Sequence, residues 1–153
     1  MLLNLLVGLP VMLLCLVMEA IFVTLCLRYY ARHYTRFKHV GPGRKSITLN
    51  ILLLSIVMLL MLLGNFVQMI IWAVMFILIG EFDEFASALY YSAVNFATLG
   101  YGDIVMTERW RLLGPLEAAN GIMMFGVSTA VMTAAVLDVI KHNIAALRQN
   151  DQP

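Results

Sequence analysis

The sequence is poor in charge, in cysteine and in the residue patterns that carry enzyme chemistry. Only 12% of its 153 residues are charged and the formal net charge is +1, so bulk charge predicts no nucleic-acid partner. The two cysteines, Cys15 and Cys26, form no CxxC pair and have no histidine cluster nearby, which argues against a zinc site or a redox pair. No nucleophile–base pair, metal-ligand spacing or phosphate-binding loop is visible, so the sequence does not predict an enzyme.

What the sequence has in abundance is apolar residues. Hydrophobic residues make up 62% of the chain and the mean hydropathy is +0.89, values above those of an ordinary soluble domain. They gather in three runs, each longer than the about 20 residues that cross a bilayer as a helix. The runs are 2–27, 47–79 and 112–140. We therefore predict an all-α membrane protein with three transmembrane helices.

The first run is predicted to be a retained membrane helix rather than a cleaved signal peptide, because it begins without Lys or Arg and has a long apolar core. Its basic residues follow, over 28–45, where no acidic residue occurs. The positive-inside rule makes this linker cytoplasmic, so the N-terminus lies outside and the C-terminus inside. Anionic lipid headgroups are a further expected partner of the 28–45 linker. Its basic residues are Arg28, Arg32, Arg36, Lys38, Arg44 and Lys45.

A short segment and a glycine-containing loop lie between the second and third runs. The segment 85–97 is too short to span a bilayer and is predicted to be a re-entrant helix, whose irregular continuation is tolerated at membrane depth only inside protein. It leads into Thr98-Leu99-Gly100-Tyr101-Gly102-Asp103. Alternating glycines permit backbone dihedrals that residues with a Cβ rarely adopt, which lets successive carbonyl oxygens point the same way. Four such loops around one axis form rings of oxygens able to replace the hydration shell of a potassium ion.

The loop 98–103 resembles the selectivity filter of the potassium-channel superfamily, usually TVGYGD, with Leu99 in place of valine. The resemblance is to the two-transmembrane pore-loop type and covers a pore domain over 46–141. It implies an outer helix over 47–79, a pore helix over 85–97, the filter over 98–103 and an inner helix over 112–140. The first helix with its basic linker, 1–45, is additional, and 142–153 is a short cytoplasmic tail. One loop per chain cannot enclose an ion, so we predict a cyclic homotetramer.

The resemblance also implies which atoms handle the ion. Backbone carbonyls of Thr98, Leu99, Gly100 and Tyr101 bind dehydrated K⁺, assisted by the Thr98 hydroxyl, and Gly102 completes the filter. The permeant ion is the only ligand this requires, with no organic cofactor. Because the backbone does the coordinating, the Leu99 change need not abolish selectivity, although its bulkier side chain must be packed behind the filter.

Three residues around the filter are candidate supports. Tyr90 and Tyr91 occupy positions where related channels often carry two tryptophans, and their hydroxyls are available to bond Tyr101 or the surroundings of the filter. Asp103 is placed to concentrate cations at the mouth. Val94 stands where some bacterial channels have a glutamate that bonds the filter aspartate, so Asp103 needs another partner here.

The third run carries cavity and gate candidates. Gly121 matches the glycine at which related inner helices bend, and hinge and close helix packing are both open for it. Phe125, Thr129 and Thr133 share one helical face, which the resemblance places near the cavity, although the threonine hydroxyls can equally bond their own helix backbone. Asn120 is a further cavity candidate.

Polar residues inside the apolar runs are expected to face protein or water. Glu117, one helical turn before Asn120, is expected to brace the pore helix. Glu19 and Asn65 are expected to form structural hydrogen bonds.

The predicted function is passive K⁺ conduction across the cell membrane. A weakly selective cation channel is the alternative that Leu99 favours. An accessory, non-conducting subunit of a K⁺ channel or of a K⁺-uptake system is the other alternative. The gating stimulus is not readable from the sequence.

Overall fold

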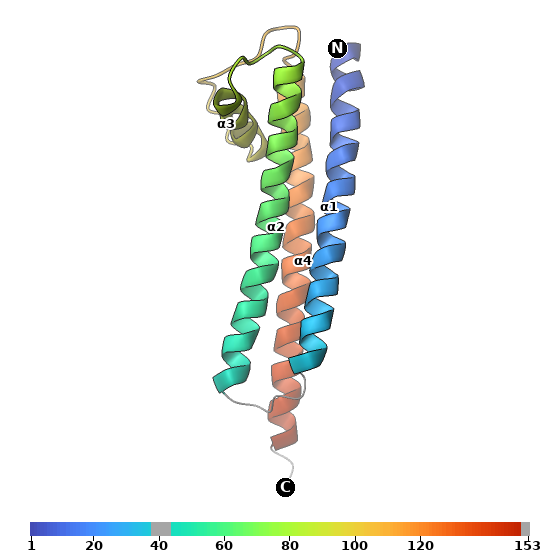
Figure 1. Ribbon diagram of the computed structural model, residues 1–153, viewed down its shortest axis with the longest axis vertical. Helices are drawn as coiled ribbons and strands as arrows, with labels where there is room; N and C mark the ends of the chain where they lie inside the picture. The colour runs from blue at the N-terminus through green and yellow to red at the C-terminus, as the bar shows by residue number, and fades with distance from the viewer. Residues whose placement is uncertain (38–43, 151–153) are drawn as a thin grey trace. The chain divides into compact units, whose positions relative to one another are not determined.

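The computed structural model describes residues 1–37 and 44–150, with side chains placed for residues 1–32, 48, 50–141 and 144. Over these residues the chain is built of helices and loops, without strands, as the all-α prediction requires. In chain order the helices are α1 (Leu2–Phe37), α2 (Arg44–Leu78), α3 (Phe85–Phe96) and α4 (Leu113–Asn150) (Figure 1).

Three of these helices are long and apolar enough to cross a membrane, over Leu2–Arg32, Asn50–Leu78 and Leu113–Lys141. The run predicted as an outer helix over 47–79 lies in α2, and the pore-helix segment 85–97 corresponds to α3. The inner-helix segment 112–140 lies in α4, which continues through 142–150, the stretch assigned from the sequence to a tail. Residues 38–43 of the basic linker and 151–153 of the tail lie outside the described residues.

The chain divides into two compact units. The first consists of Met1–Ile21 and Leu63–Gly126, and contains α3 and the loop that follows it. Its core is a cluster of buried side chains from all four helices and from the loop after the filter segment. The members are Cys15, Trp72, Met75, Phe76, Tyr91, Phe96, Met106, Trp110, Leu113 and Met124.

Within the first unit, α1 turns one narrow stripe inward. Asn4, Gly8, Cys15 and Glu19 are buried and recur at intervals of three to four residues or twice that, the spacing of one helical face. Gly8 brings α1 close to α4, since a Cβ at this position would lie 2.7 Å from Leu116 Cδ1. The other faces of this part of α1 are mostly exposed leucines, as suits a helix in lipid. The added helix is therefore an integral part of the unit that holds the pore loop.

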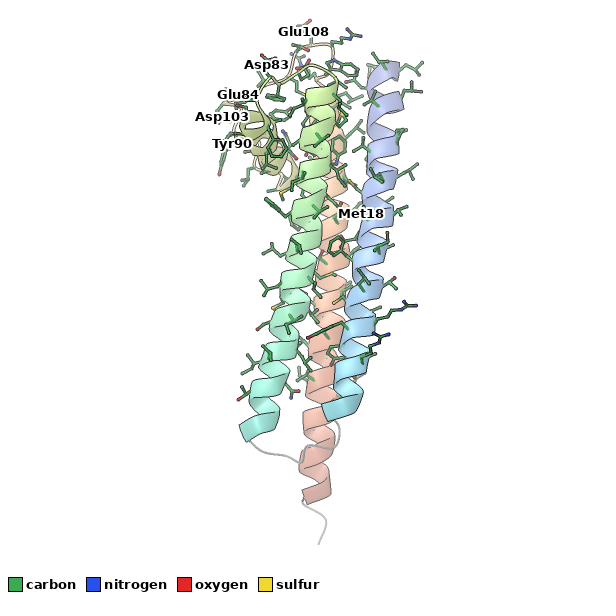
Figure 2. All side chains as sticks on the ribbon, viewed as in Figure 1. Met18, Asp83, Glu84, Tyr90, Asp103 and Glu108 are labelled. Carbon is green, nitrogen blue, oxygen red and sulfur yellow. The ribbon has the colours of Figure 1, made fainter. Side chains whose placement is uncertain are left out.

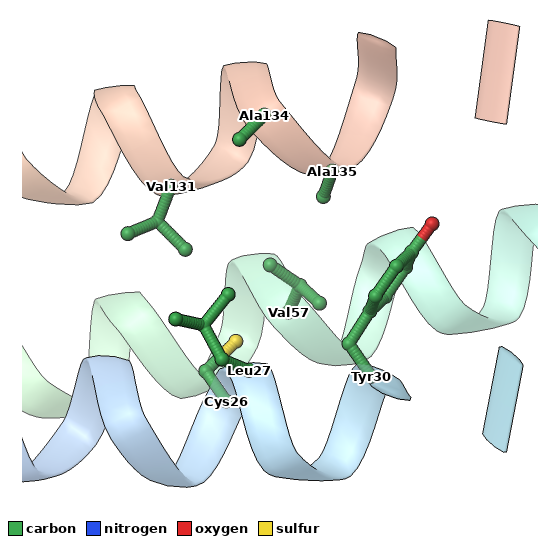
Figure 3. A pocket seen from close by; sticks show the side chains of 7 residues that line it. All are labelled: Cys26, Leu27, Tyr30, Val57, Val131, Ala134 and Ala135. Atoms are coloured by element: carbon green, nitrogen blue, oxygen red, sulfur yellow. The ribbon is translucent and has the colours of Figure 1, made fainter. Parts of the chain in front are cut away.

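The second unit consists of Phe22–Leu62 and Val127–Pro153. Its small core contains Cys26, Val57, Met61 and Ala135. The Tyr30 hydroxyl donates a 2.9 Å hydrogen bond to Asp138 Oδ2, which joins α1 to α4 in this unit. An apolar pocket of about 100 Å³ opens beside the core, surrounded by side chains of α1, α2 and α4 (Figure 3). Its lining residues are Cys26, Leu27, Tyr30, Val57, Val131, Ala134 and Ala135.

Candidate ion-conduction site

The short helix α3 ends in a backbone arrangement that passes directly into the filter segment. The N–H of Thr98 donates to the carbonyl of Asn95 at 2.8 Å, and the N–H of Leu99 donates to that of Val94 at 2.9 Å. This pair of bonds is the Schellman motif, which normally places glycine in the left-handed conformation after the helix. Here that position is Thr98, with φ 59°, and no other described non-glycine residue has a positive φ. Thr98, the first residue of the loop 98–103, therefore also terminates α3.

The backbone that follows alternates in handedness. Positive φ values occur at Thr98 (59°), Gly100 (56°) and Gly102 (75°), whereas Leu99 and Tyr101 between them lack a positive φ. A left-handed conformation costs a residue with a Cβ about 1–2 kcal/mol, so two of the three positions carry glycine. Alternation of this kind turns successive peptide groups to the same side, the geometry from which a concave row of like dipoles is built.

Asp103 has a partner of its own in the subunit. Tyr90 Oη donates a 2.7 Å hydrogen bond to Asp103 Oδ2, and both side chains lie on the exposed side of α3 (Figure 2). The bond lowers the pKa of Asp103 below its ordinary value, because it stabilises the carboxylate. It raises the pKa of Tyr90, because the hydroxyl must keep its proton to donate the bond. Tyr90 thus supplies the partner for Asp103 that Val94 does not provide.

Tyr91 points the opposite way from its neighbour and anchors α3 to the core. Its ring packs edge-on against Phe76 of α2 with centroids 5.4 Å apart, and against Phe82 at 5.2 Å. The side chain is 8% exposed, and a Cβ on Gly114 of α4 would lie 2.9 Å from the Tyr91 hydroxyl. Of the two tyrosines, only Tyr90 contacts the filter segment through an observed bond, and Tyr91 sets the position of the helix that carries it.

The helix α4 contacts α3 through a face that contains two glycines and a glutamate. Gly114, Glu117 and Gly121 are three or four residues apart and so share one side of the helix. At Gly121 the approach is very close, since a Cβ there would lie 2.0 Å from the backbone carbonyl oxygen of Phe96. Such a contact leaves no room for any side chain, so close packing against the end of the pore helix is one definite role of Gly121.

Glu117 reaches α3 between the two glycines. The Ser92 hydroxyl bonds the Glu117 carboxylate and also lies 2.8 Å from the backbone carbonyl oxygen of Met69 on α2. Ser92 and Glu117 are both fully buried. The expected brace between Glu117 and the short helix α3 is present, and Ser92, which the sequence interpretation did not single out, donates its hydroxyl to the Glu117 carboxylate.

The remaining inner-helix candidates differ in where they lie. Asn120 is fully buried inside the first unit rather than on a surface that faces a cavity. Phe125 is 36% exposed and its ring packs edge-on against Phe96, with centroids 5.5 Å apart. In the second unit Thr129 and Thr133 are exposed, and the Thr133 hydroxyl donates to the Thr129 carbonyl at 2.8 Å, so that hydroxyl bonds its own helix.

The loop after the filter segment is fastened at two points of the first unit. The carboxylate of Glu81, just after α2, accepts bonds from the backbone N–H of Thr107 at 3.0 Å and from the Thr107 hydroxyl. Asn4 Nδ2 of α1 donates to the carbonyl of Arg109 at 2.8 Å. The side chains labelled in Figure 2 show that the acidic residues Asp83, Glu84, Asp103 and Glu108 gather at this same end of the unit.

The filter residues themselves face outward from the single chain. Leu99 is 55% exposed and Tyr101 is 65% exposed, and Val105 farther along the loop is 76% exposed. A pocket of about 330 Å³ lies beside the loop and includes Tyr91, Asn95, Gly100, Gly102 and Arg111 in its lining. Among the described residues, no group of three or more His, Cys, Asp or Glu side chains is placed to hold a metal ion.

Two long apolar helices that flank a short helix and a glycine-containing loop are the arrangement of a pore-loop membrane protein. Residues 66–138 match the protein family described as Ion channel, a segment that runs from within α2 through α3 and the loop into α4. Over this segment the chain is similar to the family of two-transmembrane pore-loop ion channels, which confirms the resemblance drawn from the sequence. Neither a search of curated proteins nor one of solved structures gave a match.

Proposed function

We propose that the protein is a potassium-selective channel that conducts K⁺ passively through a homotetrameric pore. The observation that carries this proposal is the alternation of φ along Thr98–Gly102 at the end of a short helix. A loop with this alternation presents a row of carbonyl oxygens, and four copies around one axis supply the cage that a dehydrated K⁺ requires. The carbonyls of Thr98, Leu99, Gly100 and Tyr101 are the ligands in this proposal.

The exposed faces of the loop support the need for further copies. A chain in isolation leaves Leu99 and Tyr101 largely uncovered, and a cyclic assembly gives them neighbours. Tyr90 and Asp103 hold the outer end of each loop, while Phe96 and Gly121 fix its inner end against α4. In this arrangement Phe125, Thr129 and Thr133 face the conduction path.

The decisive experiment measures K⁺ flux into liposomes that contain only the purified protein. Gly100→Ala and Gly102→Ala each add a Cβ to a left-handed residue, at about 1–2 kcal/mol per copy and so about 4–8 kcal/mol over four copies. We expect both variants to lose K⁺ flux while remaining folded oligomers. Gly80→Ala is the matched control, because Gly80 also has a positive φ (77°) with open space around it but lies in the turn after α2. Undiminished flux in either filter variant contradicts the proposal.

A weakly selective cation channel is the second candidate, and Leu99 favours it. Its side chain is larger than the usual valine and lies 55% exposed, so its packing in an assembly bears on the width of the filter. Reversal potentials in mixed K⁺ and Na⁺ separate the two candidates, and Leu99→Val is the informative variant. Flux from purified protein without other subunits rules out an obligate accessory role.

We also propose that the N-terminus lies outside the cell membrane and that the basic linker and C-terminus are cytoplasmic. The exposed Arg28 and Arg32 at the end of the α1 span support this orientation and an encounter with anionic lipid headgroups. A cysteine introduced at position 38, in the part of the linker outside the described residues, should react with an impermeant thiol reagent only from the inside. Labelling from the outside alone would show that the topology is inverted.

A further inference from the structure

A cluster of polar side chains is buried in the first unit, on the side of α3 that faces the other helices. It draws on α1, α2, α3 and α4, and none of its members exposes more than 2% of its surface. The members are Cys15, Glu19, Gln68, Trp72, Ser92, Glu117 and Asn120. Polar groups at such depth in membrane helices are costly, so a cluster of this size calls for a physical explanation.

The cluster forms a connected path from the first helix to the pore helix. Gln68 Nε2 of α2 donates a 2.9 Å hydrogen bond to Glu19 Oε2 of α1. The adjacent residue on α2 is Met69, whose carbonyl oxygen accepts the Ser92 hydroxyl of α3. Cys15, one turn before Glu19, lies within interaction range of Asn120 and Trp72 and of both carboxylates. The path therefore runs from Glu19 on α1 to Ser92, six residues before Thr98.

Several polar atoms in the cluster have no strong hydrogen-bond partner in the protein, since the Cys15 thiol beside Trp72 and Asn120 is only a weak one. The acceptors are Gln68 Oε1, Glu117 Oε2 and Asn120 Oδ1, and the donors are Trp72 Nε1 and Asn120 Nδ2. Each such buried group costs about 1–3 kcal/mol when nothing bonds it. Because donors and acceptors occur together and do not bond one another, their ligand must both donate and accept.

Water is the ligand that meets this mixed set. A buried water molecule takes two to four polar partners, and the unpartnered atoms offer acceptors on α2 and α4 together with the indole N–H of Trp72. A bare cation suits the carboxylate and amide oxygens but is opposed by the N–H groups of Trp72 and Asn120, and the described residues offer no metal-holding group of three acidic, thiol or imidazole side chains. We propose that bound water molecules occupy this cluster and couple α1 to the pore helix, so that Glu19 is a positioning residue for the filter.

The family match begins at residue 66, so Cys15 and Glu19, the members of the cluster on α1, lie outside the matched segment. The hydrated site gives the added helix a structural role, because α1 holds Gln68 and, through the Met69 carbonyl and Ser92, fixes the height of α3 against α2 and α4. The consequence for conduction rests on the proposed channel function, whereas the presence of water does not. The two claims are tested by separate measurements.

The first measurement is oxidative labelling of the intact protein in liposomes by hydroxyl radicals generated from water with X-rays. Radicals formed from a bound water attack side chains beside it, so Trp72 and Cys15 should be modified although neither exposes its surface. Met61 is the matched control, because it is reactive, equally buried and lies in the apolar core of the second unit. We expect Trp72 to be labelled at least tenfold faster than Met61. Equal protection of Trp72 and Met61 overturns the hydrated site, whether or not the protein conducts.

The second measurement compares Glu19→Gln with the double variant Glu19→Leu/Gln68→Leu in the same liposomes. The first keeps a hydrogen-bonding side chain of the same shape, and we expect a K⁺/Na⁺ permeability ratio within twofold of the unmodified protein. The double variant replaces both partners by apolar groups, which preserves the fold better than breaking the pair. Here we expect the permeability ratio to fall at least tenfold and Trp72 labelling to drop to the Met61 level.

A purely structural role for Glu19 would alter the yield or thermal stability of the oligomer but not the permeability ratio of the channels that form. Leu16→Ala, an exposed position on the same helix, controls for changes to α1 in general and should match the unmodified protein. If the double variant forms oligomers with an unchanged permeability ratio, the positioning role of Glu19 is refuted. Absence of conduction in the unmodified protein refutes the proposed function, and with it the positioning role, while the labelling result still stands for the site.

Discussion

Gly121 offers the sharpest test of how the pore helix is held. Replacement by alanine places a Cβ 2.0 Å from the carbonyl oxygen of Phe96 and 2.9 Å from its carbonyl carbon. Both groups belong to helix backbones, so relief requires the two segments to separate by at least 1 Å to reach the 3.0 Å below which real Cβ contacts essentially do not occur. Overpacking of this kind costs about 1–3 kcal/mol, and a contact between two backbones belongs at the upper end.

The net effect includes a gain from the substitution itself. Alanine favours a helix over glycine by about 1 kcal/mol, which offsets part of a cost of about 3 kcal/mol. We expect a net loss of about 2 kcal/mol per subunit in the packing of α3 on α4, a change of about 30-fold in that equilibrium. Because Phe96 lies two residues before Thr98, the displacement reaches the filter, and selectivity should fall together with the stability of the oligomer.

The assay has two readouts and an internal control. Thermal stability of the purified oligomer in detergent reports the packing, and reversal potentials in mixed K⁺ and Na⁺ report the filter. Gly126→Ala lies on the same helix with nothing within 4 Å of the added Cβ, so it should leave both readouts unchanged or raise the stability slightly. If Gly121 acts only as a hinge, Gly121→Ala instead lowers channel opening without a loss of stability or selectivity. Unchanged stability in Gly121→Ala would refute the packing argument.

Two further predictions concern hydrogen bonds on either side of this contact. Tyr90 keeps the pKa of Asp103 below its ordinary 3.8, so the stabilisation from this bond is complete above pH 3.8 and is lost only as the pH falls through the lowered pKa. Tyr90→Phe should therefore move the acid limit of K⁺ flux to higher pH. An identical acid limit in the two proteins would contradict the assignment of this bond. In the second unit, Tyr30→Phe removes the 2.9 Å hydrogen bond to Asp138. It should lower the stability by about 1.5–3 kcal/mol, as expected for a bond to a charged group. Thermal unfolding in detergent measures this loss. Asp138→Asn retains an acceptor oxygen and should lose less, and equal losses from the two substitutions would argue against this bond.

The sequence allows the spanning helices and the loop motif to be predicted because each depends on local information. Run length alone identifies the helices, and the spacing of Gly100 and Gly102 identifies the loop. The bond between Tyr90 and Asp103 is less accessible, because helical periodicity puts Tyr90 and Tyr91 about 100° apart without saying which of them faces the filter. In the structure Tyr91 packs against the aromatic rings of Phe76 and Phe82 in the core, which leaves Tyr90 on the side of the loop 98–103.

The buried polar cluster shows what a single sequence leaves undetermined. Glu19 and Glu117 are conspicuous as charged residues in apolar runs, but Gln68, Ser92 and Cys15 gain meaning only when three spans and α3 are brought together. One signal was present in the sequence: Asn4, Gly8, Cys15 and Glu19 form a polar and small-residue stripe along an otherwise leucine-rich helix. Such a stripe indicates a buried helix contact, although it does not identify the partner. Asn120 was open to the same ambiguity, since cavity and subunit interior both attract polar side chains.

The change of hand that begins at Thr98 has a consequence for how this stretch of chain can evolve. Every second residue from Thr98 has a left-handed backbone, so the distance of a residue from the end of α3 decides whether it must adopt that conformation. Insertion or deletion of one residue before Gly100 would shift the following residues by one position. Leu99 or Tyr101 would then occupy a left-handed position, which only glycine adopts at low cost. Length changes here are therefore expected to come in pairs of residues, whereas the loop from Ile104 to Arg111, outside the alternation, is free of that restriction.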